Sequence, residues 1–440
     1  MRARASRLVA STDLDPSAST DRPSLLAVTS EAPWPLDSGG HLRTYHLLRS
    51  LAAAFDLRLV APTFGRDEES RVALERAGVR PRLVAVGPRT AVTEAFKVGL
   101  AAVSREPYVL FARHRRRAVS RTLREESTHR PPDVLYLDHL DSLVYAGGHG
   151  RVPLVVDMHN VYSRLALRAA AEARGAVRRR YLAGEAALIA RMEQRAVQVA
   201  HTILAVSDDD ARYFSALGAA RVVTVPNGVD CAAYNRLPAE ARTGPPTILY
   251  VGSLSWPPNV SAARFLAVEV LPVVRRRLPD ARVIIVGKDP DPDLMALART
   301  DAGVHVVGSV PDVVPYFRNA HVLAVPLEAG GGTRLKILEA FAAGLPVIGT
   351  TVGCEGICAR DGEHLVIADR RGFAAAIIQL LLDPAGARDR AQRAQCLARE
   401  RYDWSVVAAL ARDAVAAAAS GRAAPATPHR LAMHTSGPPA

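Results

Sequence analysis

The residues whose types and spacing most clearly suggest chemistry follow a run of three glycines at positions 330–332. Arg334, Lys336 and Glu339 come directly after this run. Unpaired backbone N–H groups at the start of a helix attract anions, because the aligned peptide dipoles place partial positive charge there. Cations beside such amides suit a diphosphate, and a carboxylate accepts hydrogen bonds from ribose hydroxyls. The segment therefore predicts a binding site for a nucleoside diphosphate.

A helix over residues 333–343 is expected to position these side chains. Gly332, Lys336, Glu339 and Ala343 follow one another at steps of four, three and four residues, which is a single stripe along a helix. The apolar residues lie mostly on the other side, so the helix would bury them and present its charges to a cleft. The alternative interpretation is a surface ion pair between Lys336 and Glu339, which contributes about 0.2–0.5 kcal/mol.

Short apolar runs alternate with longer amphipathic stretches along most of the chain, for example in "DLRLVAP", "DVLYLD" and "HTILAVS". This alternation predicts β-α-β units and parallel sheets. It is interrupted by a segment rich in Pro, Gly and Asn at 226–246, which predicts a linker between an α/β domain at 23–225 and another at 247–400. The polar ends, a leader at 1–22 and a tail at 420–440, are expected to be disordered. Because ligands of open parallel sheets bind beyond the carboxyl ends of the strands, the site is expected in the cleft between the domains.

The chain is basic, with 56 Lys and Arg against 44 Asp and Glu in 440 residues, and two segments hold most of the excess. Residues 111–130 contain seven Arg and two Glu, and residues 164–195 contain eight Arg and three Glu. Neither contains a zinc-finger, RNP or helix-turn-helix pattern, so we expect no nucleic-acid partner. Solvated helix faces and contact with an anionic membrane or acceptor remain as the two interpretations.

The four cysteines, at positions 231, 354, 358 and 396, lack the paired spacing of a metal site, so no bound metal is predicted. No apolar run approaches the roughly 20 residues that a membrane-spanning helix needs. The arginines near the N-terminus are followed by no long apolar stretch, so no secretory signal is expected. We therefore expect a cytoplasmic protein, with peripheral contact at the inner membrane face left open.

Several motifs together resemble a known family. The runs "GGTRLKILEAFAAGLPVIGTTVGCEGI", "ILYVGSLSWPPNVSAARFL", "VPNGVD" and "VHVVGSVPDVVPYFRNAHVLAVPL" resemble the retaining glycosyltransferases of family 4. The resemblance covers most of residues 24–415 and is denser in the second half. It implies the GT-B fold, an α/β architecture of two facing Rossmann-like domains with a cleft between them. It also implies a C-terminal helix, expected at 401–419 and beginning near Trp404, that crosses back to the first domain.

The resemblance also implies roles for individual residues. Family members typically carry two glutamates eight positions apart on this helix; Glu339 matches the second, which binds the donor ribose, and Gly331 stands where the first would be. Arg334 and Lys336 match the basic pair on the diphosphate, and His159 in "VVDMHNVY" resembles the histidine near the donor sugar. The predicted catalytic residues are His159, Arg334 and Lys336. The predicted donor-binding residues are Gly39, Gly40, Gly252, Gly331, Gly332, Thr333 and Glu339.

The implied activity is transfer of a sugar from a nucleotide-diphosphate sugar to an acceptor hydroxyl, with retention of configuration and without a metal or another cofactor. UDP or GDP is the expected nucleotide, and the acceptor is a glycan, a lipid-linked molecule or a small molecule. Two alternatives are a nucleotide-sugar 2-epimerase of similar fold and a catalytically silent homologue that only binds the nucleotide sugar.

Overall fold

The structure is a computed structural model that describes residues 22–65, 67–87, 90–147, 151–173, 175–235, 244–330 and 332–421. The leader and the tail expected at the two ends lie almost wholly outside these ranges. Gly331 and residues 236–243 of the expected linker also lie outside them. The remaining residues predicted to form the site are all described.

The first half of the chain forms a seven-stranded sheet in the order β3-β2-β1-β4-β5-β6-β7, and its neighbouring strands are parallel. The β1 residues alternate between two apolar clusters: Leu25 and Ala27 pack with helix α1 (Gly39–Ala54) on one face, and Leu26 and Val28 pack on the other. Strands covered on both faces read as continuous apolar runs, which explains their pattern in the sequence. The strands are β1 (Ser24–Val28), β2 (Asp56–Thr63), β3 (Arg80–Ala85), β4 (Val134–Asp138), β5 (Leu154–Met158), β6 (Thr202–Ala205) and β7 (Val222–Thr224).

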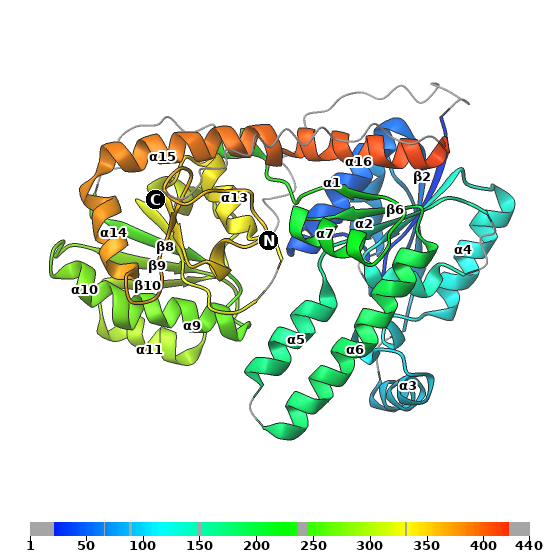
Figure 1. Cartoon of the computed structure of the whole chain (residues 1–440), viewed down its shortest axis with the longest axis horizontal. Helices are drawn as coiled ribbons and strands as arrows, with labels where there is room; N and C mark the ends of the chain where they lie inside the picture. Colours follow the sequence, from blue (N-terminus) through cyan, green and yellow to red (C-terminus); the bar gives the residue numbers. More distant parts are fainter. Residues whose placement is uncertain are drawn as a thin grey trace, which may run out of the picture.

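Helices cover both faces of this sheet (Figure 1). They are α1 (Gly39–Ala54), α2 (Asp67–Arg76), α3 (Ala91–Ser104), α4 (Arg117–His129), α5 (Tyr162–Glu172), α6 (Ala176–Val199) and α7 (Asp208–Ala216), with the shorter turns η1 (Tyr108–Ala112) and η2 (Leu140–Tyr145). Figure 1 shows that α5 and α6 form a hairpin that projects from the lower side of the domain, on the same side as α3.

The second half forms a six-stranded sheet in the order β10-β9-β8-β11-β12-β13, again with parallel neighbours. Its strands are β8 (Thr247–Val251), β9 (Arg282–Val286), β10 (Val304–Gly308), β11 (Val322–Val325), β12 (Val347–Gly349) and β13 (Val366–Ile367). Its helices are α9 (Pro257–Phe265), α10 (Leu271–Arg275), α11 (Pro292–Thr300), α12 (Val314–Asn319), α13 (Leu335–Ala342) and α14 (Phe373–Leu382), with the turns η3 (Leu266–Val270) and η4 (Val352–Cys354). These elements share one hydrophobic core.

The chain passes between the two domains twice. The first passage includes the short helix α8 (Cys231–Asn235). The second runs through α15 (Pro384–Leu397), η5 (Ala398–Tyr402) and α16 (Trp404–Ala419), which lie end to end above both domains in Figure 1. The Trp404 ring stacks on His46 of α1 with ring centroids 4.5 Å apart. The last helix is thereby fixed to the first domain.

The helix predicted over 333–343 begins two residues later, because α13 starts at Leu335. Gly332 has a φ of 76°, a left-handed conformation that an α-helix cannot include. Gly332 therefore belongs to the loop before the helix, which corrects the predicted stripe at its first position. Lys336 and Glu339 are inside the helix as predicted.

Among the described residues, no helix combines the length and the apolar character that a bilayer-crossing segment requires.

Candidate functional site

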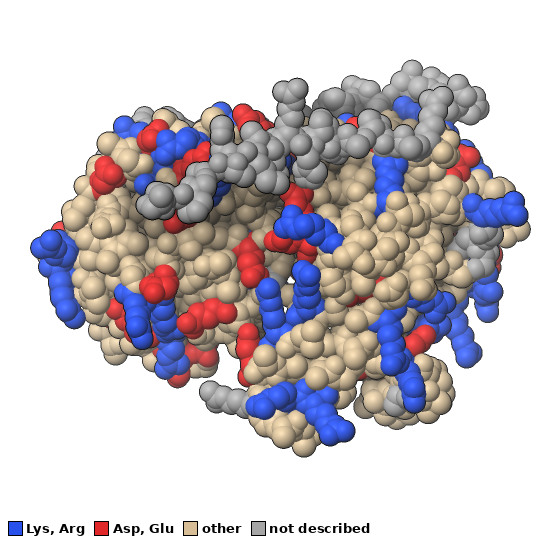
Figure 2. Space-filling model, viewed as in Figure 1, with Lys and Arg blue, Asp and Glu red and all other residues tan. Residues whose placement is uncertain are grey.

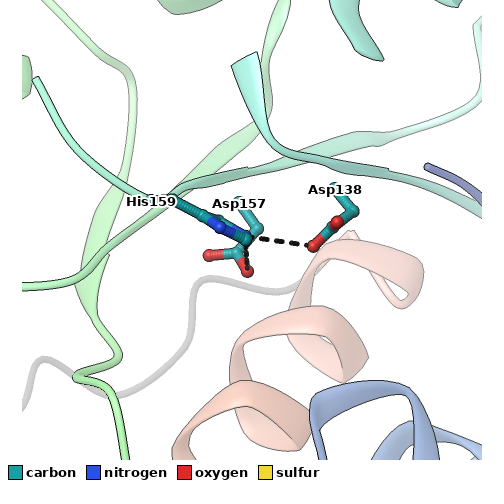
Figure 3. Close-up of side chains that lie close together, drawn as sticks. All are labelled: Asp138, Asp157 and His159. Atoms are coloured by element: carbon teal, nitrogen blue, oxygen red, sulfur yellow. Dashed lines mark hydrogen bonds and ion pairs between the residues drawn. The ribbon is translucent and has the colours of Figure 1, made fainter. Parts of the chain in front are cut away.

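His159 lies at the carboxyl end of β5, between two buried carboxylates from neighbouring strands (Figure 3). Its Nε2 atom is 3.2 Å from Asp138 Oδ1 and 3.4 Å from Asp157 Oδ2. Burial opposes the charged imidazolium, but the two carboxylates outweigh burial and raise the pKa of His159 to about 9. The ring is therefore protonated at neutral pH, and Nδ1 also carries a proton that it can donate.

Helix α1 holds this cluster in place. Arg43 donates from Nε and from a terminal nitrogen to the Asp157 carboxylate, at 2.9 and 2.6 Å, and Thr44 donates to Asp138 at 2.9 Å. The Arg43 guanidinium and the His159 ring hold the pKa of Asp157 below its usual range, although burial alone would raise it. The atoms of Asp138, Asp157 and His159 lie within 4.8 Å of one another, which is metal-ligand spacing. The two carboxylates, however, already accept hydrogen bonds from Arg43, Thr44, Tyr136 and His159.

The two glycines predicted to contact the donor form the start of α1. Ser38 caps this helix by accepting a hydrogen bond from His41 N at 3.1 Å. A Cβ atom on Gly40 would lie 3.8 Å from His159 Nδ1, so this nitrogen faces the glycine turn. A Cβ atom on Gly39 would lie 2.8 Å from Leu335 Cδ1, so the start of α1 meets the start of α13 across the cleft. A side chain at position 39 would have to displace the end of the Leu335 side chain.

Lys336 lies on the second-domain side of the same junction. Its Nζ atom is 4.5 Å from the centroid of the Tyr250 ring, and a Cβ atom on Gly252 would lie 2.9 Å from it. This buried nitrogen has no hydrogen-bond partner among the described residues. Burial and the nearby Arg334 lower the pKa of Lys336 to about 7, while Glu339 opposes that shift. An anion beside Nζ would restore its charge.

Arg334 occupies the cap position of α13 and is only 6% exposed. Its guanidinium donates to the carbonyl oxygen of Val352 at 3.2 Å. Burial lowers the pKa of Arg334, and the Glu355 carboxylate acts in the opposite direction. Glu339 follows Lys336 by one helical turn and is half-buried. Two cations and one carboxylate are therefore gathered around the first turns of α13.

The glycine loop before α13 contacts the first domain. A Cβ atom on Gly332 would lie 2.6 Å from Asn160 Oδ1, and the neighbouring Thr333 has a buried Oγ1 with no hydrogen-bond partner among the described residues. Gly331, predicted to contact the donor, lies outside the described residues. Of the other predicted residues, the structure brings Gly40 and His159 together in the first domain and Gly252 and Lys336 together in the second, with Gly39 and Gly332 at the contact between the domains. Thr333 and Arg334 lie beside Gly332, and Glu339 lies one helical turn after Lys336.

Sequence reasoning missed two parts of the site. The first is the buried set of Arg43, Asp138 and Asp157, although the position of each aspartate at the end of an apolar run was an available signal. The second is Arg168 of α5, which crosses the cleft and donates to Gly330 O at 2.8 Å and to Glu355 at 2.6 and 3.2 Å. Arg168 belongs to one of the arginine-rich segments, and nothing in the sequence pattern separates it from its neighbours.

A pocket of about 140 Å³ adjoins this junction and is lined by both domains. Its polar lining residues include Asn160, Arg164, Ser207, Asp210 and Thr333. Burial raises the pKa of Asp210 to about 6. An engineered cavity of about 150 Å³ holds one benzene ring, so this pocket is of the size for a single six-membered ring.

Two family models match the chain, one for each domain. "Glycosyltransferase Family 4" matches residues 38–233, and "Glycosyl transferases group 1" matches residues 245–383. Together they cover most of the described chain. The family predicted from the sequence motifs is therefore confirmed.

Among curated proteins, glycogen synthase of Mycobacterium tuberculosis is 29% identical over 235 residues, which are 51% of this chain and 55% of that protein. The phosphatidyl-myo-inositol mannosyltransferase of the same species is 34% identical over 218 residues, which are 47% of this chain and 56% of that protein. The chain thus spans about half the length of the curated relatives it matches.

Two solved structures extend the comparison of the fold. Anabaena Alr3699/HepE in complex with UDP-glucose has a TM-score of 0.61 at 15% identity, covering 89% of this chain and 99% of that one. WaaG, a glycosyltransferase involved in lipopolysaccharide biosynthesis, has a TM-score of 0.61 at 16% identity, covering 88% of this chain and 98% of that one. The GT-B fold predicted from the motifs is confirmed, and the chain belongs to family 4 of the glycosyltransferases.

Proposed function

We propose that the chain transfers a sugar from a nucleotide-diphosphate sugar to an acceptor hydroxyl, with retention of configuration. The observation that carries this proposal is the buried Lys336 ammonium group. It has no hydrogen-bond partner among the described residues and lies where the start of α13 meets the start of α1. A buried cation without such a partner is costly unless a ligand supplies one.

The donor is proposed to lie across this junction. Lys336 and Arg334 would hold the diphosphate from the second domain, and the amides around Gly39 and Gly40 would hold it from the first. Glu339 would accept hydrogen bonds from the ribose, as a carboxylate can. Gly252, Gly331, Gly332 and Thr333 complete the proposed donor site. The protonated Nδ1 of His159 faces Gly40 and would donate to the sugar.

UDP or GDP is the proposed nucleotide. A protein of the same fold binds UDP-glucose, which supports a nucleoside-diphosphate donor for this chain.

These residues account for the chemical step without a protein base. As the glycosidic bond to the diphosphate breaks, negative charge develops on the leaving phosphate, and Lys336, Arg334 and the helix amides stabilise it. His159 and its carboxylates orient the sugar from the opposite side. In the retaining route proposed here, the acceptor attacks from the face that the diphosphate leaves, and a phosphate oxygen takes the acceptor's proton. No metal ion is required in this scheme.

The acceptor is proposed to occupy the pocket beside Asn160. Its lining of Arg164, Ser207 and Asp210 offers donors and acceptors to a hydroxylated ring. A glycan, a lipid-linked sugar and a cyclic polyol all present such a ring.

The protein is proposed to be cytoplasmic and to contact the anionic inner face of a membrane through its arginine-rich segments. Arg178, Arg179 and Arg180 at the start of α6 are exposed, as are Arg117 and Arg121 of α4. This exposure leaves the arginines free to meet anionic headgroups, as the membrane interpretation requires.

The matching family models both describe glycosyltransferases, which does not favour a nucleotide-sugar 2-epimerase. A silent homologue would keep the donor site and lack turnover.

Thermal unfolding in the presence of UDP, GDP or ADP tests the donor site. One of these nucleotides should stabilise the protein, by about 2.7 kcal/mol at 100 times its dissociation constant, and Lys336→Met should remove most of that gain. Release of the same nucleotide from its sugar derivative, measured over a panel of glycan and polyol acceptors, separates an active enzyme from a silent homologue. The anomeric configuration of the product, read by NMR, tests retention. Stabilisation by none of the nucleotides would contradict the proposal.

A further inference from the structure

Helix α3 exposes an unusual amount of apolar surface. Val92 is 80% exposed, Phe96 is 73% exposed and Val103 is 84% exposed. With Val98 and Leu100, this helix carries five of the fourteen large hydrophobic side chains that are exposed in the described part of the chain. An exposed apolar patch of this kind on a folded domain usually marks a surface that another body covers.

The charged residues of α3 point toward the protein instead of toward water. Lys97 Nζ donates to Arg113 O at 3.1 Å and lies 3.4 Å from Glu94, and the Tyr108 hydroxyl donates to Glu94 at 2.5 Å. The side chains of Glu94 and Lys97 are only 20% and 18% exposed. A helix on a water-facing surface has the opposite arrangement, with apolar residues inward and charges outward. The outer face of α3 is thus built for an apolar environment.

Exposed arginines lie on α4, which follows α3 in the chain, and on the α5–α6 hairpin. On α4 they are Arg117, Arg121 and Arg124. The tip of the α5–α6 hairpin carries three exposed arginines at 178–180, flanked by Val177 and Tyr181, which are 86% and 54% exposed.

The helix and the hairpin tip project on the same side of the first domain (Figure 1), and lysine and arginine side chains follow that edge (Figure 2). One flat surface could therefore touch both.

We propose that the outer face of α3 and the α5–α6 tip together form a docking surface for an anionic lipid bilayer. Apolar side chains would enter the boundary between headgroups and acyl chains, and the arginines would contact the headgroups. The 14 residues of α3 extend about 21 Å, which is shorter than the roughly 30 Å hydrocarbon core. The helix therefore lies in the interface and does not cross it. This inference rests on the membrane contact proposed above and is independent of which sugar is transferred.

Charge favours a bilayer over a second copy of the chain as the body that covers this surface. A two-fold dimer would bring the same patch on both copies together. The exposed arginines of α4 and of the hairpin tip would then face one another and repel. Anionic headgroups complement the same arginines.

Co-sedimentation of the full chain with vesicles tests the proposal. Vesicles of phosphatidylcholine are compared with vesicles that also contain phosphatidylglycerol. The chain should bind the anionic vesicles and release from them as salt is raised.

Three variants target the parts of the surface. Phe96→Asp combined with Val103→Asp should weaken binding about tenfold or more, because two inserted side chains become charged. Phe96→Ser combined with Val103→Ser should also weaken vesicle binding. Serine adds no charge, so this variant measures the loss of the apolar side chains without repulsion from the anionic headgroups. Arg178→Ala, Arg179→Ala and Arg180→Ala together should weaken binding to anionic vesicles only.

Val268→Asp is the matched control, because Val268 is 49% exposed on η3 of the second domain; its binding should equal that of the parent. Nucleotide-induced thermal stabilisation should be the same in all these variants. Loss of nucleotide binding would therefore be measured separately from loss of vesicle binding.

The proposal is overturned if the parent binds neither kind of vesicle, or if it binds both equally at all salt concentrations. It is also overturned if the Val268→Asp control loses as much binding as the α3 variants. A dimer in solution that Phe96→Asp dissociates would show that a second copy covers this face instead.

Discussion

The Lys336 ammonium group lies over the Tyr250 ring. Burial and the nearby Arg334 disfavour its positive charge there. Burial lowers its pKa to about 7, so the free protein loses this charge as pH rises through the neutral range. A bound diphosphate would raise the pKa, so donor binding takes up a proton at pH values above 7. Affinity for a nucleotide sugar should therefore be highest below pH 7 and fall as pH rises. The fall should be up to about tenfold per pH unit, until the pH reaches the pKa of Lys336 in the complex. Titration calorimetry between pH 6 and pH 9 would measure this.

The Lys336→Arg variant is the control for that pH dependence, because an arginine stays charged throughout this range. Its affinity should be flat until the pH approaches 9, where His159 begins to lose its proton in parent and variant alike. A nucleotide sugar is the ligand to use, because its diphosphate lacks the terminal phosphate that titrates near pH 6 in free nucleotides. An affinity of the parent that does not change between pH 6 and pH 8.5 would contradict the role given to Lys336.

Glu339 supplies the second residue-scale prediction. If its carboxylate accepts hydrogen bonds from the ribose hydroxyls, Glu339→Ala should weaken donor binding by roughly 1.5–3 kcal/mol. This is the usual contribution of a hydrogen bond to a charged group. Glu328→Ala is the matched control. Glu328 is exposed and pairs with Arg370 at 2.7 Å, so its loss should leave donor affinity unchanged. Equal affinities of parent and Glu339→Ala would remove the ribose role.

Among the elements, α1 is held to the sheet by apolar packing, by the Thr44 hydrogen bond to Asp138 and by a buried ion pair. Arg43 is 1% exposed and bonds the fully buried Asp157 of β5, as well as Pro226 O at 3.0 Å in the segment leading to the second domain. Arg43→Met should lower the free energy of unfolding by about 3–5 kcal/mol, because the buried Asp157 carboxylate loses its bidentate partner and keeps only His159 as a neighbouring cation. Urea denaturation measures this change.

Arg49 lies on the same helix and is exposed, so Arg49→Met should change that free energy by no more than about 0.5 kcal/mol. Equal stability of the two variants would show that the buried pair does not hold α1.

The elements that sequence predicted best were those with a local signal. The buried strands appear as continuous apolar runs, and the positions of Lys336 and Glu339 follow from helical spacing. The start of α13 was set two residues too early, because the spacing rule includes Gly332 while the backbone turns left-handed there.

The ion pair between Arg43 and Asp157 could not be predicted, since it joins residues 114 positions apart. Such a contact depends on strand order, and no local pattern in this chain encodes it. The same holds for Arg168, whose partners in the second domain are 162 and 187 positions away.

At the scale of the whole molecule, Arg168 links the two domains across the cleft. It bonds both the glycine loop at Gly330 and the Glu355 carboxylate. The pair is partly exposed, so it contributes only about 0.2–1 kcal/mol, yet it acts directly between the two domains that line the proposed donor site. Arg168→Met should therefore enlarge the radius of gyration of the free protein in small-angle scattering. It should also lower turnover several-fold, with less effect on overall stability.

Arg264→Met is the control for this prediction. Arg264 forms a similarly exposed pair with Asp293 within the second domain, so its loss should alter neither the radius of gyration nor turnover. If Arg168→Met scatters like the parent, the contact does not hold the cleft closed.

The central claim is that a nucleoside diphosphate lies between the start of α13 and the start of α1. The most direct test is a crystal structure of the full chain with the nucleotide that stabilises it most. We expect diphosphate oxygens within hydrogen-bond distance of Lys336 Nζ and of the Arg334 guanidinium, with the ribose on Glu339 and the terminal phosphate facing Gly40 and His159. A nucleotide bound elsewhere, with Lys336 Nζ still lacking a hydrogen-bond partner, would contradict this account.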